Sequence, residues 1–162
     1  VTEVVFRLNK QPKFKLGYGN IQKELEQMDI ETLTIQAVSD AVIRIRQSKL
    51  PDPKVIGNAG SFFKNPVISK AHYQSLLEQY PDMPGYAGAN ENIIKVPAAY
   101  LIEKAGWKGF RSECVGVHNL QPLVLVHYGG GIGSEILSLS ERIIESVHNT
   151  YNIELEREVQ IY

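Results

Sequence analysis

The sequence has 162 residues, 43% of them apolar, which is enough for one well-packed domain or for one domain plus part of another. Its 17 basic and 18 acidic side chains leave a formal net charge of −1, so no global field favours nucleic acid or an anionic membrane as a partner. No stretch approaches the roughly 18 consecutive apolar residues of a membrane span and no secretion signal opens the chain, so we expect a soluble, cytoplasmic protein.

The first part of the chain predicts one strand and two helices. The apolar stretch Val1–Leu8 is typical of a strand. The spacing of charged and apolar residues over 21–29 predicts a short helix. A longer helix follows, with Ser39 as its amino-terminal cap, and Pro51 ends it.

Pro51, Asp52 and Pro53 predict an extended connector, because proline fixes its own φ and moves the preceding residue out of the helical region. We take this connector as the boundary between two parts, residues 1–52 and residues 53–162. The chain begins and ends in apolar, strand-like stretches, whereas most domains begin and end with polar residues. We therefore expect a piece of a longer protein.

Helices and strands alternate from Pro66 onward. The predicted strands lie at 67–68, 93–96, 114–117, 123–128 and 155–162, and the predicted helices at 71–79, 98–105 and 134–151. The third and fourth of these strands are joined by turn residues and predict a hairpin. Elements mixed in this order predict an α+β fold or a mixed α/β sandwich, and we take the α+β fold, with a mixed sheet and helices packed on it.

A glycine-rich run, GGGIGS at 129–134, lies between a predicted strand and a predicted helix, as phosphate-binding loops do. It lacks the ending of a P-loop and the third glycine of the dinucleotide fingerprint. Ser134 and Glu135 instead suit a helix start, where an oxygen and a negative charge stabilise free N–H groups. We interpret the run as a turn and cap. The four histidines show no ligand spacing and Cys114 is the single cysteine, so we expect no metal and no internal disulfide.

The segment 49–66, KLPDPKVIGNAGSFFKNP, combines residues that restrict the backbone with residues that leave it free. Its prolines stiffen the entry, while Gly57 and Gly60 allow a ligand to approach the backbone closely. Ser61 lies between these glycines and two aromatic residues, and three lysines surround it with positive charge. From the residues alone, a binding site and an ordinary surface loop remain equally good interpretations.

This segment resembles the UDP-N-acetylenolpyruvoylglucosamine reductase (MurB) family, in which GNAGSFFKNP carries the catalytic serine. Further segments match the family in the same order along nearly the whole chain. They are Arg46 with the KLPDP segment at 49–53, AAYLIEKAGWKG at 98–109, VHNLQPLVLV at 117–126 and LEREV at 155–159.

The resemblance implies an oxidoreductase of peptidoglycan synthesis, and hence of cell wall biogenesis, cell shape and cell division. Members of the family are flavoproteins that pass a hydride from NADPH through FAD to UDP-N-acetylglucosamine enolpyruvate, giving UDP-N-acetylmuramate. The resemblance makes residues 53–162 the substrate-binding domain, with the final strand returning to the active site, and residues 1–52 the end of the FAD-binding region. The rest of that region and a catalytic arginine in it have no match here, so we expect this chain alone to bind no flavin tightly and to be inactive.

By the same resemblance, Ser61 is the proton donor and Glu158 is the second catalytic residue. A serine hydroxyl is a poor acid in water, so it must be held in place among groups that stabilise its alkoxide. Glu158 beside a substrate carboxylate must be protonated or bridged by a cation. Without the resemblance we would favour a simple pair between Glu158 and Arg157. Arg157 stands where many members have proline, and we expect it to stay outside the chemistry.

The resemblance assigns other residues to the UDP-sugar enolpyruvyl substrate. These are Lys49, Asn65, Tyr86, Lys108 and Gln121. Lysines suit a diphosphate as point charges, and Tyr86 lies on a loop that we expect to close over it. The cofactor-binding residues belong mostly to the unmatched region, with Arg46 as a candidate here. We expect a monomer.

Two hypotheses of other classes remain open from the sequence. A non-catalytic nucleotide-sugar binding module would keep the scaffold without the reaction, but it would not need both Ser61 and Glu158. A pure interaction domain has support only in the first 40 residues, which lack motifs and have balanced charge.

Overall fold

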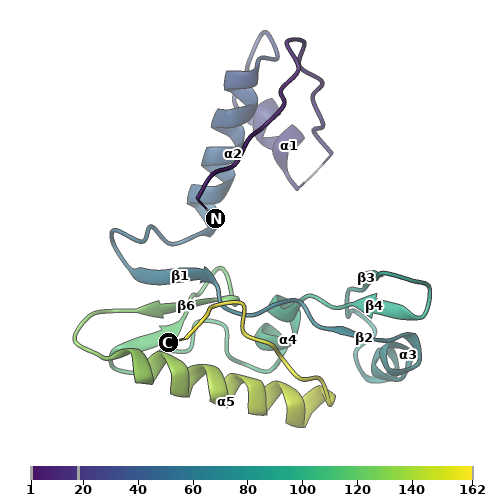
Figure 1. Cartoon of the computed structure of the whole chain (residues 1–162), viewed down its shortest axis with the longest axis vertical. Helices are drawn as coiled ribbons and strands as arrows, with labels where there is room; N and C mark the ends of the chain where they lie inside the picture. Colours follow the sequence, from purple (N-terminus) through teal and green to yellow (C-terminus); the bar gives the residue numbers. More distant parts are fainter. Residues whose placement is uncertain (1, 18, 162) are drawn as a thin grey trace. The chain divides into compact units, whose positions relative to one another are not determined.

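The structure is a computed structural model that describes residues 2–17 and 19–161. The chain divides into two units, Val1–Lys49 and Leu50–Tyr162, whose elements are labelled in Figure 1. The assignment of residues 1–52 to a FAD-binding region and of residues 53–162 to a substrate-binding domain remains a prediction.

Two helices pack together in the first unit, α1 (Ile21–Gln27) and α2 (Ile35–Lys49). Leu25 of α1 is buried against Ala37 and Ala41 of α2, whose small side chains let the helices approach closely. Both helices were predicted, and α1 lies within its predicted range.

The start of α2 differs from the prediction. The Thr34 hydroxyl accepts a hydrogen bond from the Ala37 N–H at 3.1 Å and caps the helix, whereas Ser39 lies inside it. The prediction of Ser39 as the cap is wrong. Threonine and serine are both good caps, and the burial of Ala37 against α1 favours the earlier start.

The predicted opening strand is also absent from the described residues, since 2–8 have no regular structure. Val5 and Phe6 are 84% and 76% exposed. A strand needs a neighbour for its backbone hydrogen bonds, and nothing in the described part of the first unit supplies one. An apolar pattern alone therefore does not make this segment a strand.

Three antiparallel strands form the first sheet of the second unit. They are β1 (Gly57–Ser61), β6 (Val124–His127) and β5 (Val115–Val117), in the order β1-β6-β5. The pairing of β5 with β6 confirms the predicted hairpin.

A second antiparallel sheet follows the order β2-β4-β3. Its strands are β2 (Val67–Ser69), β4 (Ile93–Lys95) and β3 (Tyr86–Ala87). Helix α3 (Lys70–Gln79) packs against β2 and β4, and the Ser69 hydroxyl caps it by accepting the His72 N–H at 3.1 Å. Two small antiparallel sheets thus replace the single mixed sheet of the prediction, because strands of two or three residues carry too little pattern to show their direction.

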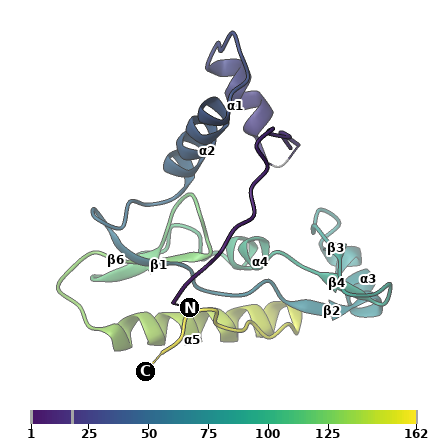
Figure 2. The ribbon, with the colours of Figure 1, turned by 45° about the horizontal axis from the view of Figure 1, so that its top comes forward.

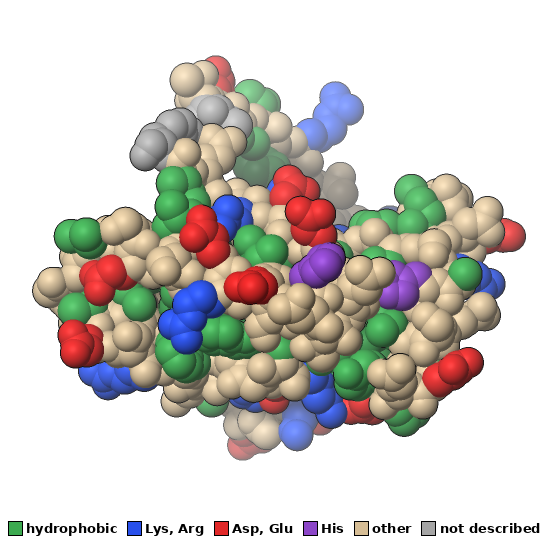
Figure 3. Space-filling model, turned by 90° about the horizontal axis from the view of Figure 1, so that it is seen from below, with side chains coloured by type: hydrophobic (Ala, Val, Ile, Leu, Met, Phe, Trp, Pro, Cys, Tyr) green, Lys and Arg blue, Asp and Glu red, His purple; other side chains and the backbone are tan. Residues whose placement is uncertain are grey.

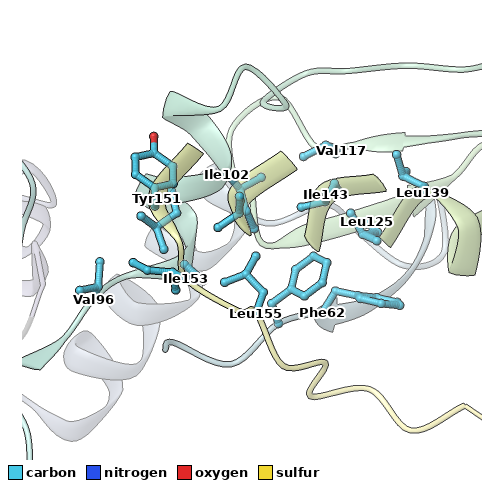
Figure 4. Close-up of a cluster of buried hydrophobic side chains, with 14 of the residues drawn as sticks. Phe62, Val96, Ile102, Val117, Leu125, Leu139, Ile143, Tyr151, Ile153 and Leu155 are labelled. Atoms are coloured by element: carbon cyan, nitrogen blue, oxygen red, sulfur yellow. The ribbon is translucent and has the colours of Figure 1, made fainter. Parts of the chain in front are cut away.

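Helices α4 (Ala98–Lys104) and α5 (Gly133–Tyr151) complete the second unit. Helix α5 packs against β5, β6 and α4, and Figures 1 and 2 show it running along the first sheet. Side chains from both sheets and all three helices share one core. Part of this core is drawn in Figure 4, and its largest buried members are Phe63, Leu101, Ile102, Leu125, Leu139, Ile143, Tyr151 and Ile153. The predicted α+β class is confirmed.

The structure differs from the prediction at the last strand and at the connector. Residues 155–161 form only one isolated antiparallel bridge, between Phe63 and Arg157, and Tyr162 lies outside the described residues. At the connector, Asp52 makes a turn in place of an extended segment, since its carbonyl and its carboxylate accept the N–H groups of Val55 and Lys54, both at 2.9 Å. Of the helices described, none is long and apolar enough to cross a membrane.

Candidate active site

Ser61 ends β1 immediately after a bulge. Asn58 pairs with Val126 and Ser61 with Val124, so β1 carries one more residue than β6 between the two pairs. The Asn58 side chain forms the bulge, donating to the Ile56 carbonyl at 3.0 Å and accepting the Gly60 N–H at 3.1 Å. Gly60 has φ +74°, which glycine adopts without strain. This local geometry sets the direction of the exposed Ser61 side chain.

Two phenylalanines hold the chain in place after Ser61. Phe62 and Phe63 are buried, with their rings in edge contact at 5.3 Å between centroids. The Phe62 N–H donates to the Leu123 carbonyl at 2.8 Å, which continues the alignment with β6. The serine is therefore exposed on a backbone that is fixed on both sides.

The end of the chain brings Glu158 to the same place. The Glu158 N–H donates to the Phe62 carbonyl at 2.9 Å, and the Lys64 N–H donates to the Glu156 carbonyl at 2.8 Å. These two bonds enclose the bridge between Phe63 and Arg157. Residues from the two ends of the second unit thus meet through backbone hydrogen bonds.

Ser61 and Glu158 line one pocket of about 620 Å³. Its polar lining also includes Lys64, Asn65 and Lys95, and its apolar lining is Phe63, Val67, Leu123 and the small residues 87–89. In the described part of the chain, neither the Ser61 hydroxyl nor the Glu158 carboxylate has a hydrogen-bond partner. Both groups are available to a ligand.

Lys95 is a pocket residue that sequence reasoning missed. Lys64 is paired with Glu156, whereas no carboxylate within the described residues pairs with Lys95. In the strand register, Lys95 lies opposite Val67 on one side and Tyr86 on the other, so the three side chains share one face of the second sheet. The only sequence signal for Lys95 was its place within the predicted strand 93–96.

Of the other predicted site residues of the second unit, one lines the pocket and the rest lie outside its lining. Asn65 lines the pocket, and its Oδ1 accepts the Ala98 N–H at the start of α4 at 2.9 Å, leaving its amide N–H groups for a ligand. Tyr86 is 61% exposed on β3 and lies outside the pocket lining. Lys108 forms an ion pair with Glu103 at 2.7 Å, away from the pocket lining.

The remaining predicted residues are Gln121, Arg46 and Lys49. Gln121 lies in the β5–β6 turn, where its carbonyl accepts the Val124 N–H at 3.0 Å, and it is not among the pocket residues. Arg46 and Lys49 lie in the last turn of α2, in the first unit. The site roles of all these residues remain predictions.

Arg157 does not pair with Glu158. Its Nε donates to the Ser140 hydroxyl of α5 at 2.8 Å, and its guanidinium lies 3.7 Å from the Glu141 carboxylate. The alternative interpretation, in which Glu158 is a strand-end residue paired with Arg157, is therefore wrong.

The segment after α3 is held by a hydrogen bond and an ion pair at Asp82. The Asp82 carboxylate accepts the Tyr100 hydroxyl at 2.7 Å and pairs with Lys104 at 2.7 Å. Lys104 and Tyr100 together hold the pKa of Asp82 below its usual value, while burial and then Asp82 raise the pKa of Tyr100. These contacts tie the segment after α3 to α4, close in sequence to the β3 strand.

The glycine-rich loop does not fit a phosphate or a dinucleotide cofactor. The Glu135 carboxylate accepts the Ile132 N–H at 2.8 Å at the start of α5, so a negative charge already occupies the position that a phosphate would take. Ile132, not Ser134, is the N-cap, so Glu135 has the predicted role and Ser134 does not. Among residues 2–17 and 19–161, no cluster of His, Cys, Asp and Glu suits a metal ion.

The family model that describes the UDP-N-acetylenolpyruvoylglucosamine reductase C-terminal domain matches residues 52–162, which include the whole pocket. The chain belongs to this reductase family. Reductases of that name are 52% identical over 161 residues in Amoebophilus asiaticus, 46% over 162 in Flavobacterium johnsoniae and 43% over 162 in Pseudomonas aeruginosa. These matches cover 99–100% of this chain but 47–48% of each relative, so the chain spans about half the length of the reductases it matches.

Proposed function

We propose that this chain is the substrate-binding part of a cytoplasmic, NADPH-dependent reductase that converts UDP-N-acetylglucosamine enolpyruvate to UDP-N-acetylmuramate in peptidoglycan synthesis. The observation that carries the proposal is the pocket in which Ser61, Glu158 and the unpaired Lys95 come together. In the intact enzyme, bound FAD supplies the hydride. The glycine-rich loop of this chain does not fit that cofactor, and we assign FAD binding to the rest of the reductase, with residues 1–52 as its end.

Ser61 is the proposed proton donor. Hydride addition to the enolpyruvyl double bond leaves negative charge on the carbon next to the substrate carboxylate, and this carbon must then be protonated. The bulge at Asn58 and the buried phenylalanines hold the Ser61 hydroxyl in one direction, which lowers the entropic cost of proton transfer. Positive charge in the pocket stabilises the alkoxide that remains.

Glu158 is the proposed partner of the substrate carboxylate. Two carboxylates repel unless one is protonated or a cation lies between them. Lys64 is already engaged with Glu156, so Lys95 is the pocket cation that is free to balance this charge or the diphosphate. Lys49, Tyr86, Lys108 and Gln121 are proposed contacts of the nucleotide-sugar, together with Asn65.

The decisive experiment replaces Ser61 with alanine in the intact reductase that contains this chain. We expect kcat for substrate-dependent NADPH oxidation to fall by at least about 100-fold, while reduction of the flavin by NADPH without substrate stays unchanged. Ser75→Ala is the matched control, because Ser75 is an exposed serine of α3 outside the pocket. Wild-type kcat in Ser61→Ala would refute the proton-donor role.

The same assay separates a catalytic protein from a binding module. If the intact protein binds the enolpyruvyl substrate in a titration but the substrate never stimulates NADPH oxidation, the non-catalytic nucleotide-sugar module is correct. The isolated chain is expected to be inactive in either case, so only the intact protein answers the question.

A further inference from the structure

Ser140 is the one buried polar side chain among the described residues, with an exposed fraction of 0%. Its hydroxyl donates to the Leu137 carbonyl within α5 at 2.7 Å and accepts from Arg157 Nε at 2.8 Å. Arg157 is itself partly buried, with its side chain 27% exposed. A hydroxyl in the core is costly unless its hydrogen-bonding capacity is used, and here both bonds are made. Helix α5 therefore presents one specific acceptor to the carboxy-terminal segment.

Arg157, which donates to the Ser140 hydroxyl, directly precedes Glu158 in the sequence. In an extended segment, successive side chains point to opposite sides. Arg157 is directed to α5, and Glu158 lines the pocket with Ser61. A shift of one residue in the segment would exchange these two directions.

Apolar burial on the same side as Arg157 also fixes the register of this segment, since Leu155 is buried in the core and Val159 packs against it. The segment pairs with the chain around Phe63 through two backbone hydrogen bonds and no longer ladder. The ion pair of Lys64 with Glu156 is exposed on both sides, with side-chain exposures of 50% and 71%, and such pairs contribute little. Of these two polar side-chain contacts, the partly buried bond from Arg157 to Ser140 is therefore the more selective.

The charges on α5 also favour the observed register. Glu141 and Glu145 line a groove between α5 and the carboxy-terminal segment, on the face that Figure 3 shows from the side of α5. Arg157 enters this groove as a cation near Glu141. Glu154 and Glu156 of the segment line the same groove, so a shift of one residue would put a glutamate in place of Arg157 beside Glu141, where it would be repelled.

We propose that Arg157 and Ser140 are positioning residues, whose hydrogen bond holds the carboxy-terminal segment in the register that directs Glu158 into the pocket. The inference rests on the proposed function, because it gives Glu158 its role. It also revises the expectation that Arg157 stays outside the chemistry. Arg157 acts through Glu158 and touches no substrate.

The test compares Arg157→Gln with Arg157→Met in the intact reductase. Glutamine places its Nε2 where arginine has Nε and can still donate to Ser140, whereas methionine has a methyl group there. We expect Arg157→Met to lower kcat roughly 10- to 100-fold with little change in KM, and Arg157→Gln to restore most of the loss. Ser140→Ala, which removes the acceptor, should reproduce the effect of Arg157→Met. Ser138→Ala, a change at an exposed serine of α5 outside the groove, is the matched control and should keep wild-type kcat.

A double-mutant cycle with Glu158→Gln distinguishes positioning from a general loss of structure. If Arg157 acts through Glu158, Arg157→Met causes no further fall of kcat in the Glu158→Gln background. The inference would be overturned if the falls in kcat of the two single variants multiplied in the double variant. It would also be overturned if Arg157→Gln and Arg157→Met lost the same share of kcat. Should Arg157→Met not fold, the same cycle with Ser140→Ala decides it. Unchanged kcat in Glu158→Gln itself would instead contradict the proposed function.

Discussion

The side-chain oxygen of Asn58 accepts the backbone N–H of Gly60 at 3.1 Å, across the bulge that leads to Ser61. The amide nitrogen of the same side chain donates to the Ile56 carbonyl at 3.0 Å. The Asn58 side chain thus bonds to the backbone two residues before it and two residues after it. The direction of the serine hydroxyl follows from these two bonds, because the extra residue of β1 has no partner on β6 to hold it.

Replacing Asn58 should therefore impair the reaction without touching the proton donor. In the intact reductase we expect Asn58→Ala to lower kcat roughly 10- to 100-fold through misplacement of Ser61. Asn58→Asp keeps the acceptor for Gly60 but faces the Ile56 carbonyl with a second acceptor, so it should recover only part of the loss. Steady-state kinetics of the two variants is the measurement. Equal kcat in Asn58→Ala and wild type would show that the bulge does not position Ser61.

Variants of Lys95 and Lys108 test where the substrate anion binds. Lys95 lines the pocket without an ionic partner among the described residues, whereas Lys108 is paired with Glu103. A charged hydrogen bond contributes enough that we expect Lys95→Met to raise KM for the nucleotide-sugar roughly 10- to 100-fold. Lys108→Met should change KM much less. The opposite order of the two KM values would make Lys108 the stronger of the two proposed substrate contacts.

The glycine-rich loop makes a prediction about stability. A methyl group at Gly131 would lie 2.7 Å from Cys114 Cβ and 3.0 Å from His127 Nε2, and it would also collide with the Glu135 carboxylate that caps α5. We expect Gly131→Ala to destabilise the protein by about 1–3 kcal/mol. Gly133→Ala is the matched control, since it opens α5 with free space around it and should stabilise by about 0.4–1 kcal/mol. Thermal unfolding of both variants checks the sign, and a stabilised Gly131→Ala would contradict the packing of this loop.

His118 makes stability depend on pH. Burial lowers the pKa of His118 below its usual value of 6.5, and its Nδ1 is buried without a partner among the described residues. The unfolded chain therefore binds this proton more readily than the folded one. The contribution of the neutral imidazole is fully present above about pH 6.5 and is lost as pH falls toward the lower pKa of the folded state.

Urea unfolding at about pH 7.5 and about pH 5.5 measures this contribution. We expect the free energy of unfolding to fall less between these two conditions in His118→Gln than in the wild type. Asn149→Gln, a change at an exposed, uncharged position of α5, should keep the wild-type dependence. An unchanged pH dependence in His118→Gln would show that this histidine is not the group responsible.

Local patterns in the sequence were enough for the longer elements. Helices α3, α4 and α5 and the β5–β6 hairpin have strong periodicity or β-branched runs, and each lies close to its predicted range. Strands that depend on a neighbour could not be predicted in this way. Residues 2–8 have the pattern of a strand but no neighbour, and β3 has a neighbour in β4 but only two residues of pattern.

The candidate site also has features that local sequence predicts and features that only the fold brings together. Sequence alone determined the α+β class, the helices and the segment that makes Ser61 exposed on a permissive backbone, because these depend on residues close together in the chain. The resemblance predicted Glu158 in the site of Ser61, but only the tertiary structure decided by which backbone contacts it gets there, that Lys95 lines the same pocket, and that Arg157 is bound to Ser140 and not to Glu158. These relationships depend on backbone hydrogen bonds between Phe62 or Lys64 and the end of the chain, and no local periodicity encodes a partner so distant in sequence.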